Sequence, residues 1–348
     1  MFLNSSLDSG GSERVMSIIA NGLAEKKYDV TMALLRDKKR VYYVNDDVNV
    51  VQFKYKSSNK LNKFFSRFFQ YRELLKKVKP DVIISFMWDI NLFTIISSVG
   101  YKSKIIVSER AHPCMGTQNL FRKFGQKYLY LLANKVVLQT DYVKKFFSTK
   151  VKAKAVVIPN PVEKRKAINY GNNNKKVIVA VGRLTEQKNF QLLIDSFSKF
   201  HKSFSDYRLE IYGDGPLKSV LQNMISNYGL NDYITLMGYA SDVDSKMRQA
   251  SFYVSSSNFE GISNSMLEAL SIGLPCICTD CPVGGARLVI KNNVNGILIP
   301  VGDEIALIKA MNKIANDSDF ASRLSKESLK VREEYSIDKI IKRWEELL

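Results

Sequence analysis

The chain has 348 residues, 45% of them hydrophobic, with a formal net charge of +18 at pH 7. This length exceeds one ordinary hydrophobic core and predicts two domains of about 150 to 170 residues each. No apolar run reaches the ~18 to 20 residues of a membrane span, and the start MFLNSSLDSGG lacks the basic region and apolar core of a secretory signal. We therefore expect a cytoplasmic protein.

In the first half, residues 1–160, short apolar runs alternate with longer amphipathic stretches. This rhythm predicts a parallel sheet with helices on both faces. The predicted strands are Phe2–Asn4, Val30–Leu35, Val48–Phe53, Val82–Phe86, Ile105–Ser108, Lys135–Gln139 and Ala155–Ile158.

The first strand leads into LDSGGSERV, where Gly10 and Gly11 precede a predicted helix with Ser12 as its expected cap. Two glycines let a ligand approach the backbone closely, while the helix dipole favours negative charge. Plain turn chemistry is the alternative.

Two segments of the first half are strongly basic. Residues 54–79 and residues 121–154 each hold nine Lys or Arg against one acid, interleaved with aromatic side chains. Rings at headgroup level with cations over the phosphates suit an anionic membrane surface. Nucleic acid would suit the charge too, but helix-turn-helix, zinc and RNP-type patterns are missing, so we expect no nucleic-acid partner. A solvated lysine-rich surface is the third interpretation.

The stretch IIVSERAHP ends a predicted strand at Ser108 and places Glu109, Arg110 and His112 on the following loop. A histidine there could polarise or position a hydroxyl group such as that of a sugar; a surface or core imidazole is the alternative. His201, the other histidine, lies on a polar helix end.

The alternating pattern restarts after a polar stretch, 161–175, which we expect to be an exposed linker. A second doubly wound domain, 176–330, should then face the first across a cleft, with ligands at the carboxyl ends of the strands. The last helix, within 331–348, is expected to cross back to the first domain. The predicted strands are Lys176–Val181, Leu209–Tyr212, Ile234–Met237, Phe252–Ser255, Cys276–Cys278 and Ile297–Ile299.

Two loops of the second half suit an anion. In VAVGRLTEQKN, Gly182 ends a strand and Arg183 and Lys188 follow, which could clamp a diphosphate, unless both are simply exposed cations. In IYGDGP, Gly213 begins a glycine turn whose backbone N–H groups could face an anion; a tight turn without a ligand is the alternative.

The stretch NFEGISNSMLEALSIGLP holds Glu260 and Glu268. In one continuous helix, eight steps of ~100° would point the two carboxylates about 80° apart. To share a target, Glu260 must lie in a loop and Glu268 in a helix that begins near Ser263 to Ser265 and stops at Gly273. Alternatively, Ser265 and Glu268 form a capping box with no ligand.

Four cysteines, Cys114, Cys276, Cys278 and Cys281, raise the question of a metal. Cys276 and Cys278 alternate as in a strand, and a zinc site needs four well-spaced ligands. Buried reduced thiols are the expected interpretation.

Taken together, LDSGGSERV, SERAHP, VGRLTEQKN, GDGP and the two glutamates resemble the retaining GT-B glycosyltransferases of family GT4. The resemblance runs nearly end to end, and SERAHP followed by a basic aromatic segment is similar to the branch that builds bacterial surface glycans on lipid carriers. The start MFLNSSL is shorter than the family's usual first strand, which leaves Met1 unsettled as the native beginning.

The resemblance implies a role for each motif. Glu268 would take the ribose hydroxyls and Glu260 would face the donor sugar, while Arg183 and Lys188 would stabilise the departing diphosphate. His112 would line the junction of donor and acceptor. The remaining implied contacts are Gly11, Gly182, Gly213, Gly261, Ile262, Ser263, Asn264 and Ser265 on the donor side, and Gly10, Glu109 and Arg110 on the acceptor side.

The implied activity is transfer of a hexose or N-acetylhexosamine from a nucleotide sugar, with UDP as the expected nucleotide, to a polyprenyl-diphosphate-linked saccharide at the inner face of the cytoplasmic membrane. Cations and helix N-termini aimed at the leaving diphosphate need no protein nucleophile. Because no Asp-x-Asp pair ends a strand, we expect neither metal nor cofactor. The family's first glutamate is commonly followed by G-[FL]-[GP], but here by Gly261-Ile262-Ser263, which leaves the donor sugar open. Alternatives are a lipopolysaccharide-core or soluble acceptor and, more remotely, a nucleic-acid binder.

Overall fold

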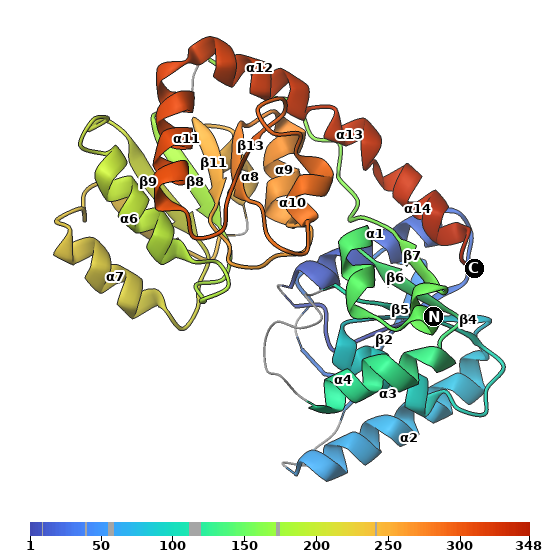
Figure 1. Ribbon diagram of the computed structural model, residues 1–348. Helices are drawn as coiled ribbons and strands as arrows, with labels where there is room; N and C mark the ends of the chain where they lie inside the picture. The colour runs from blue at the N-terminus through green and yellow to red at the C-terminus, as the bar shows by residue number, and fades with distance from the viewer. Residues whose placement is uncertain (9, 39, 55–58, 111–119, 172–174, 241) are drawn as a thin grey trace. The chain divides into compact units, whose positions relative to one another are not determined.

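The computed structural model describes residues 1–8, 10–38, 40–54, 59–110, 120–171, 175–240 and 242–348. The chain divides into two compact units, one formed by Met1–Pro161 with Ile337–Leu348 and the other by Val162–Ser336. Each unit contains one parallel sheet flanked by helices (Figure 1). None of the described helices combines the length and the apolar character that a membrane crossing requires.

The first unit is built on a seven-stranded parallel sheet. Every strand predicted in this half is confirmed, because buried β-branched runs between polar loops leave little choice of structure. In spatial order the strands are β3 (Val48–Gln52), β2 (Val30–Leu34), β1 (Phe2–Asn4), β4 (Val82–Phe86), β5 (Lys104–Ser108), β6 (Lys135–Leu138) and β7 (Ala155–Val157). Its helices are α1 (Gly11–Glu25), α2 (Lys60–Val78), α3 (Trp88–Ser97), α4 (Leu120–Tyr128), η1 (Leu129–Leu132), η2 (Asp141–Phe146), α5 (Thr149–Lys152) and α14 (Ile337–Glu345).

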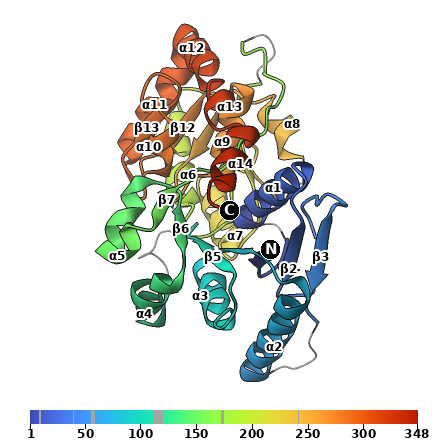
Figure 2. The ribbon, with the colours of Figure 1, turned by 90° about the vertical axis from the view of Figure 1, so that its right-hand side faces the viewer.

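Helix α14 completes the core of the first unit although it ends the sequence. Trp344 is fully buried and stacks on Phe86 of β4 with ring centroids 5.8 Å apart. Ile341 packs onto α1 at Gly22, where an added Cβ would lie 1.8 Å from the Ile341 Cδ1 atom. Figure 2 shows α1 and α14 side by side. The preceding short helix α13 (Val331–Glu334) belongs to the second unit.

The second unit repeats the architecture with six parallel strands, and again each predicted strand is confirmed. In spatial order they are β10 (Ile234–Gly238), β9 (Arg208–Tyr212), β8 (Val177–Val181), β11 (Phe252–Ser255), β12 (Cys276–Thr279) and β13 (Ile297–Ile299). The helices are α6 (Phe190–Phe200), α7 (Lys218–Asn227), α8 (Val243–Met247), α9 (Asn264–Ile272), α10 (Gly285–Val289), α11 (Glu304–Asn316) and α12 (Ser318–Ser328), besides α13.

Two local expectations need correction. The start of the segment expected as an exposed linker is part of the second unit: Val162 pairs with Ser336, and the Ile168 amide donates to the Ile272 carbonyl at 2.8 Å. Ser12 does not cap α1. The helix already begins at Gly11, with Gly10 at the N-cap, and the Ser12 hydroxyl donates to the Glu13 carboxylate at 2.7 Å.

Replacing Trp344 with alanine should lower the free energy of unfolding of the first unit by about 3 to 5 kcal/mol, because it empties a fully buried site against Phe86. The control is Trp88→Ala, which truncates a half-buried ring and should cost clearly less. Both tryptophans lie in the first unit, so in each variant the fluorescence of the remaining one reports urea unfolding of that unit. Equal losses would contradict the assigned role of α14.

Candidate functional site

The candidate site lies where the strand order of the second sheet reverses. Strands β8 and β11 are neighbours, although the chain connects β8 to β9 on one side and β11 to β12 on the other. Open parallel sheets bind ligands at such a switch point, outside the carboxyl ends of the strands. The loops that follow these two strands carry Lys188 and Glu260.

Side chains and backbone groups hold these two loops together. The Ser256 hydroxyl contacts the carbonyl oxygens of Lys188 and Asn189 at 3.0 and 2.9 Å. Asn258 donates its amide group to the Glu186 carbonyl at 2.8 Å and accepts from the Asn189 side chain at 2.9 Å. The two loops are therefore fixed relative to each other before any ligand arrives.

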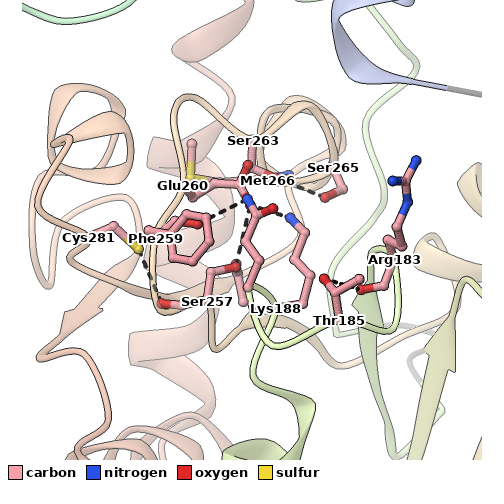
Figure 3. A network of polar contacts seen from close by, with 12 residues as sticks. Arg183, Thr185, Lys188, Ser257, Phe259, Glu260, Ser263, Ser265, Met266 and Cys281 are labelled. Carbon is pink, nitrogen blue, oxygen red and sulfur yellow. Dashed lines mark hydrogen bonds and ion pairs between the residues drawn. The ribbon is translucent and has the colours of Figure 1, made fainter. Parts of the chain in front are cut away.

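The Lys188 ammonium group forms an ion pair with the Glu260 carboxylate at the centre of this arrangement (Figure 3). Only 15% of the Lys188 side chain and 21% of the Glu260 side chain are exposed. The Ser257 hydroxyl lies 3.5 Å from the same carboxylate oxygen, Oε2. Partial exclusion of water strengthens this electrostatic contact relative to a surface pair.

Arg183 follows directly after Gly182 at the end of β8 and is exposed. Figure 3 shows its side chain apart from the Lys188–Glu260 pair. Its guanidinium group forms no ion pair with the part of the chain that the structure describes. The Arg183 guanidinium group is thus an exposed cation near the site, and its N–H groups are accessible to a ligand.

The two anion-loop motifs require glycine for different steric reasons. A Cβ on Gly182 would lie 2.8 Å from the Lys188 Cε atom, so glycine leaves room for the lysine stem. Gly213, at φ +139°, approaches the Gly182 carbonyl so closely that a Cβ would lie 1.9 Å from its oxygen.

The expectation that the GDGP backbone amides face an anion needs correction. The Gly213 amide donates to the Gly238 carbonyl at 2.8 Å, and the Gly215 amide to the Asp214 carboxylate at 2.8 Å. The Gly182 amide is also engaged, by the Tyr212 carbonyl at 2.9 Å. The Gly182 amide thus joins β8 to β9, the Gly213 amide joins the end of β9 to β10, and the Gly215 amide is held within its own turn.

Helix α9 begins where the break between the two glutamates was expected. Ser263 is the N-cap and accepts from the Met266 amide at 3.4 Å, so the alternative capping box of Ser265 and Glu268 is wrong. The Ser265 hydroxyl instead contacts the hydroxyls of Ser263 and Tyr253 at 3.0 and 2.9 Å. Leu267, Leu270 and Ile272 are buried, and Gly273 ends the helix at φ +84°.

Behind the loop of Glu260 lies a contact that the sequence motifs did not indicate. A Cβ on Gly285, at the start of α10, would lie 1.9 Å from the Gly261 carbonyl oxygen. Gly261 and Ile262 are buried, with Asn264 half-buried at the first position of α9. The backbone between Glu260 and α9 is therefore packed directly against the backbone at the start of α10.

Glu268 lies on α9 with 17% of its side chain exposed. Its carboxylate oxygen Oε1 is 3.9 Å from the Arg165 Nη2 atom. Sequence reasoning missed Arg165, which belongs to the polar stretch after the first domain and carries no motif.

In the first unit, Glu109 contradicts the expectation of an acceptor-side group. Its side chain is fully buried and accepts from Tyr130 at 2.8 Å and from Gln126 at 3.1 Å, with Arg122 Nη2 at 3.4 Å. Burial raises the pKa of this carboxyl, while Arg122 opposes the rise. Glu109 instead connects β5 to the segment of α4 and η1.

Arg110 extends the end of β5. Its guanidinium group donates to the Ser108 hydroxyl at 2.8 Å and to the Asn160 side-chain oxygen at 2.7 Å, and lies 4.7 Å from the Phe86 ring centroid. Burial lowers the pKa of Arg110 to about 9, which still leaves it charged at pH 7. Gly10 and Gly11 lie at the N-terminus of α1, whereas His112 lies outside the described residues.

The thiols Cys276, Cys278 and Cys281 are free and buried; Cys114 lies outside the described residues. Burial raises the pKa of Cys281 to about 11, and its thiol donates to the Ser257 carbonyl at 3.2 Å. Within the described ranges, no three His, Cys, Asp or Glu side chains are grouped to hold a metal ion.

Two doubly wound units, with a lysine, an arginine and two glutamates grouped around the carboxyl edge of the second sheet, define a GT-B enzyme. Family comparisons agree. Residues 162–331 match the glycosyl transferases group 1, and residues 9–166 match glycosyltransferase family 4. The chain belongs to these glycosyltransferases, and the predicted fold is confirmed.

Relatives of known activity are similar over nearly their whole length. One, 26% identical over 100% of this chain and 97% of its own, is the Campylobacter jejuni GalNAc-alpha-(1->4)-GalNAc-alpha-(1->3)-diNAcBac-PP-undecaprenol alpha-1,4-N-acetyl-D-galactosaminyltransferase. The amylovoran biosynthesis glycosyltransferase AmsD of Erwinia amylovora is 27% identical over 98% and 96%. Anabaena HepE, solved with UDP and glucose, has the same fold with a TM-score of 0.83 at 16% identity, covering 99% of this chain and 98% of its own.

The Gly213→Ala variant should destabilise the second unit by about 3 kcal/mol or more, because the new Cβ meets the Gly182 carbonyl at a φ that alanine rarely adopts. The control is Gly229→Ala, at φ +67° with open space around it, for which about 1 to 2 kcal/mol is expected. Calorimetric unfolding of both variants measures the difference. Similar losses would mean that backbone strain alone, and not the close approach of β9 to β8, requires Gly213.

Proposed function

We propose that this chain is a retaining hexosyltransferase that moves a hexose or N-acetylhexosamine from a nucleotide sugar, UDP-linked, to a polyprenyl-diphosphate-linked saccharide. The setting is bacterial surface-glycan synthesis. The observation that carries the proposal is the Lys188–Glu260 ion pair with exposed Arg183 beside it, at the switch point of the second sheet.

The proposed chemistry uses charge at the leaving group. As the bond from sugar to diphosphate breaks, positive charge develops on the sugar and negative charge on the diphosphate. The Lys188 ammonium group has three N–H donors, so it can bind phosphate oxygens while it keeps Glu260. Arg183 adds a planar fork that matches phosphate geometry, and the N-terminus of α9 adds its dipole.

In this proposal the two glutamates act on different parts of the donor. Glu260, in the loop before α9, faces the sugar, while Glu268, within α9, accepts hydrogen bonds from the ribose hydroxyls. Gly11, at the start of α1, and His112 stay predictions for the donor side and for the junction with the acceptor. So does Arg110 for the acceptor side.

The two cations take the place that a divalent metal would have at the diphosphate, so we propose a reaction without metal or cofactor. Truncation of either cation would then remove stabilisation of the developing negative charge that no metal ion replaces.

The acceptor is proposed from two observations. The name of the Campylobacter relative includes a PP-undecaprenol-linked saccharide. On the first unit, α2 and α4 both contact α3 (Figure 1). These two helices expose aromatic rings in basic surroundings: Phe65 is 52%, Phe69 65% and Phe124 54% exposed. Aromatic groups mixed with lysines suit the headgroup region of an anionic leaflet, where such an acceptor is anchored.

Lys188→Met should lower kcat for sugar transfer by about 100-fold or more, as loss of a donor to a developing anion does in other enzymes. The matched control is Lys199→Met, which removes a lysine paired with Glu304 on the surface of the same unit and should leave kcat unchanged. The assay follows transfer from UDP-sugars to a polyprenyl-diphosphate-linked saccharide, and its rate should survive EDTA. A Lys188→Met enzyme of normal kcat would refute the proposed role.

Replacing Phe65 and Phe69 together with serine should weaken binding to phosphatidylglycerol-containing vesicles by about tenfold or more, since each ring loses apolar contact with the bilayer. Ile305→Ser, which removes an apolar side chain 65% exposed on the second unit, is the control. Sedimentation with vesicles measures the bound fraction of each variant. Comparing low with high salt shows how much of the binding is electrostatic, because salt weakens the attraction of the basic surface. A wild-type protein that does not sediment with these vesicles even at low salt would favour a soluble acceptor.

A further inference from the structure

Arg165 is the centre of a charge cluster around Glu268. Its Nη1 atom donates to Asp244 Oδ1 at 2.6 Å, and its Nη2 atom lies 3.2 Å from Glu163 Oε2 and 3.9 Å from Glu268 Oε1. Only 19% of the Arg165 side chain is exposed. One partly buried guanidinium group therefore lies within ion-pair distance of three carboxylates.

The cluster fixes the position of Arg165 from a second side. Arg248 donates through Nε to Asp244 Oδ2 at 2.6 Å and through Nη1 to the Lys166 carbonyl at 2.7 Å. Although burial opposes the change, hydrogen bonds from Arg248 and Arg165 lower the pKa of Asp244. Asp244 thus stays ionised at neutral pH and holds Arg165 through a charge-assisted hydrogen bond.

The distance to Glu268 distinguishes this contact from the other two. At 3.9 Å, Arg165 Nη2 is within ion-pair range of Oε1 but too far for a hydrogen bond. Arg165 consequently acts on Glu268 through the attraction of opposite charges and not through a direct hydrogen bond.

The backbone that carries Arg165 is itself attached to the helix of Glu268. The Ile168 amide donates to the Ile272 carbonyl at 2.8 Å, in the last turn of α9. This hydrogen bond keeps the backbone near Arg165 next to the helix that carries Glu268.

We propose that Arg165 is a positioning residue for the nucleotide: through this ion pair it directs the Glu268 carboxylate toward the ribose hydroxyls, and so sets the affinity for that part of the donor. This inference rests on the proposed function, in which the Glu268 carboxylate accepts hydrogen bonds from the ribose hydroxyls. Arg165 itself contacts no substrate atom.

The test compares UDP with 2′,3′-dideoxyuridine 5′-diphosphate, which lacks both ribose hydroxyls, by calorimetric titration of the full chain. Arg165→Met should weaken UDP binding by about 10-fold, in the range seen when a partner of a partly buried charge is removed, and the dideoxy analogue by less than about 2-fold. Arg165→Lys, which restores a positive charge, should recover part of the loss. Arg332→Met is the matched control: this arginine donates to the Ser271 carbonyl of the same helix, so its loss should affect both nucleotides equally.

Glu268→Ala separates the two proposals. If it abolishes the preference of the wild type for UDP while Arg165→Met weakens both nucleotides equally, the ribose contact stands and the role of Arg165 is overturned. If the wild type binds both nucleotides equally, or neither, the ribose assignment falls, and the inference on Arg165 falls with it.

Discussion

The ion pair between Lys188 and Glu260 is the contact on which the proposed chemistry of the site depends. It joins two loops that are far apart in the sequence and meet only because β8 and β11 are neighbours in the sheet. A lysine at the end of one strand and a glutamate at the end of the next would normally extend into water. Here the hydroxyl of Ser256 and the side chain of Asn258 fix both loops first, so the two charges face each other at little further entropic cost.

The same edge of the sheet explains why glycine recurs around the site. Gly182 leaves room for the stem of Lys188, Gly213 lets β9 approach the carbonyl of Gly182, and Gly285 lets α10 approach Gly261. In each case the neighbour is a part of the protein. The GDGP motif looks like a phosphate-binding loop in the sequence, yet the amides of Gly213 and Gly215 are engaged within the second unit. The proposed binding of a diphosphate therefore depends on Lys188, Arg183 and the N-terminus of α9.

Much of this could be predicted from the sequence, for a physical reason. Strands buried on both faces are continuous apolar runs, and in a parallel sheet their carboxyl ends lie at one edge, so motifs after strands must gather there. The break between Glu260 and Glu268 followed from helix geometry and from the serines at the start of α9. These predictions needed only local chemistry and the parallel topology.

Glu109 and Arg165 show where such reasoning stops. Glu109 looked exposed beside Arg110, but Arg122, Gln126 and Tyr130, which surround it, come from a later segment with no motif of its own. Arg165 lies in a polar stretch without periodicity, and its partner Asp244 is 79 positions away. An isolated charge in a sequence is most often solvated, and only the fold tells which charges meet.

Helix α9 links the proposed chemistry to the course of the chain. The chain leaves the first unit after Pro161 and returns to it after Ser336. Next to both passages, segments of the second unit bond to the last turn of this helix: Ile168 donates to the Ile272 carbonyl and Arg332 to the Ser271 carbonyl. The N-terminus of α9 follows the loop of Glu260, and its middle carries Glu268. A nucleotide held by Glu268 would therefore contact a helix to which the segments next to both connections are attached. A helix holds such a side chain more precisely than a loop does, which is a physical reason for placing the proposed nucleotide contact on α9.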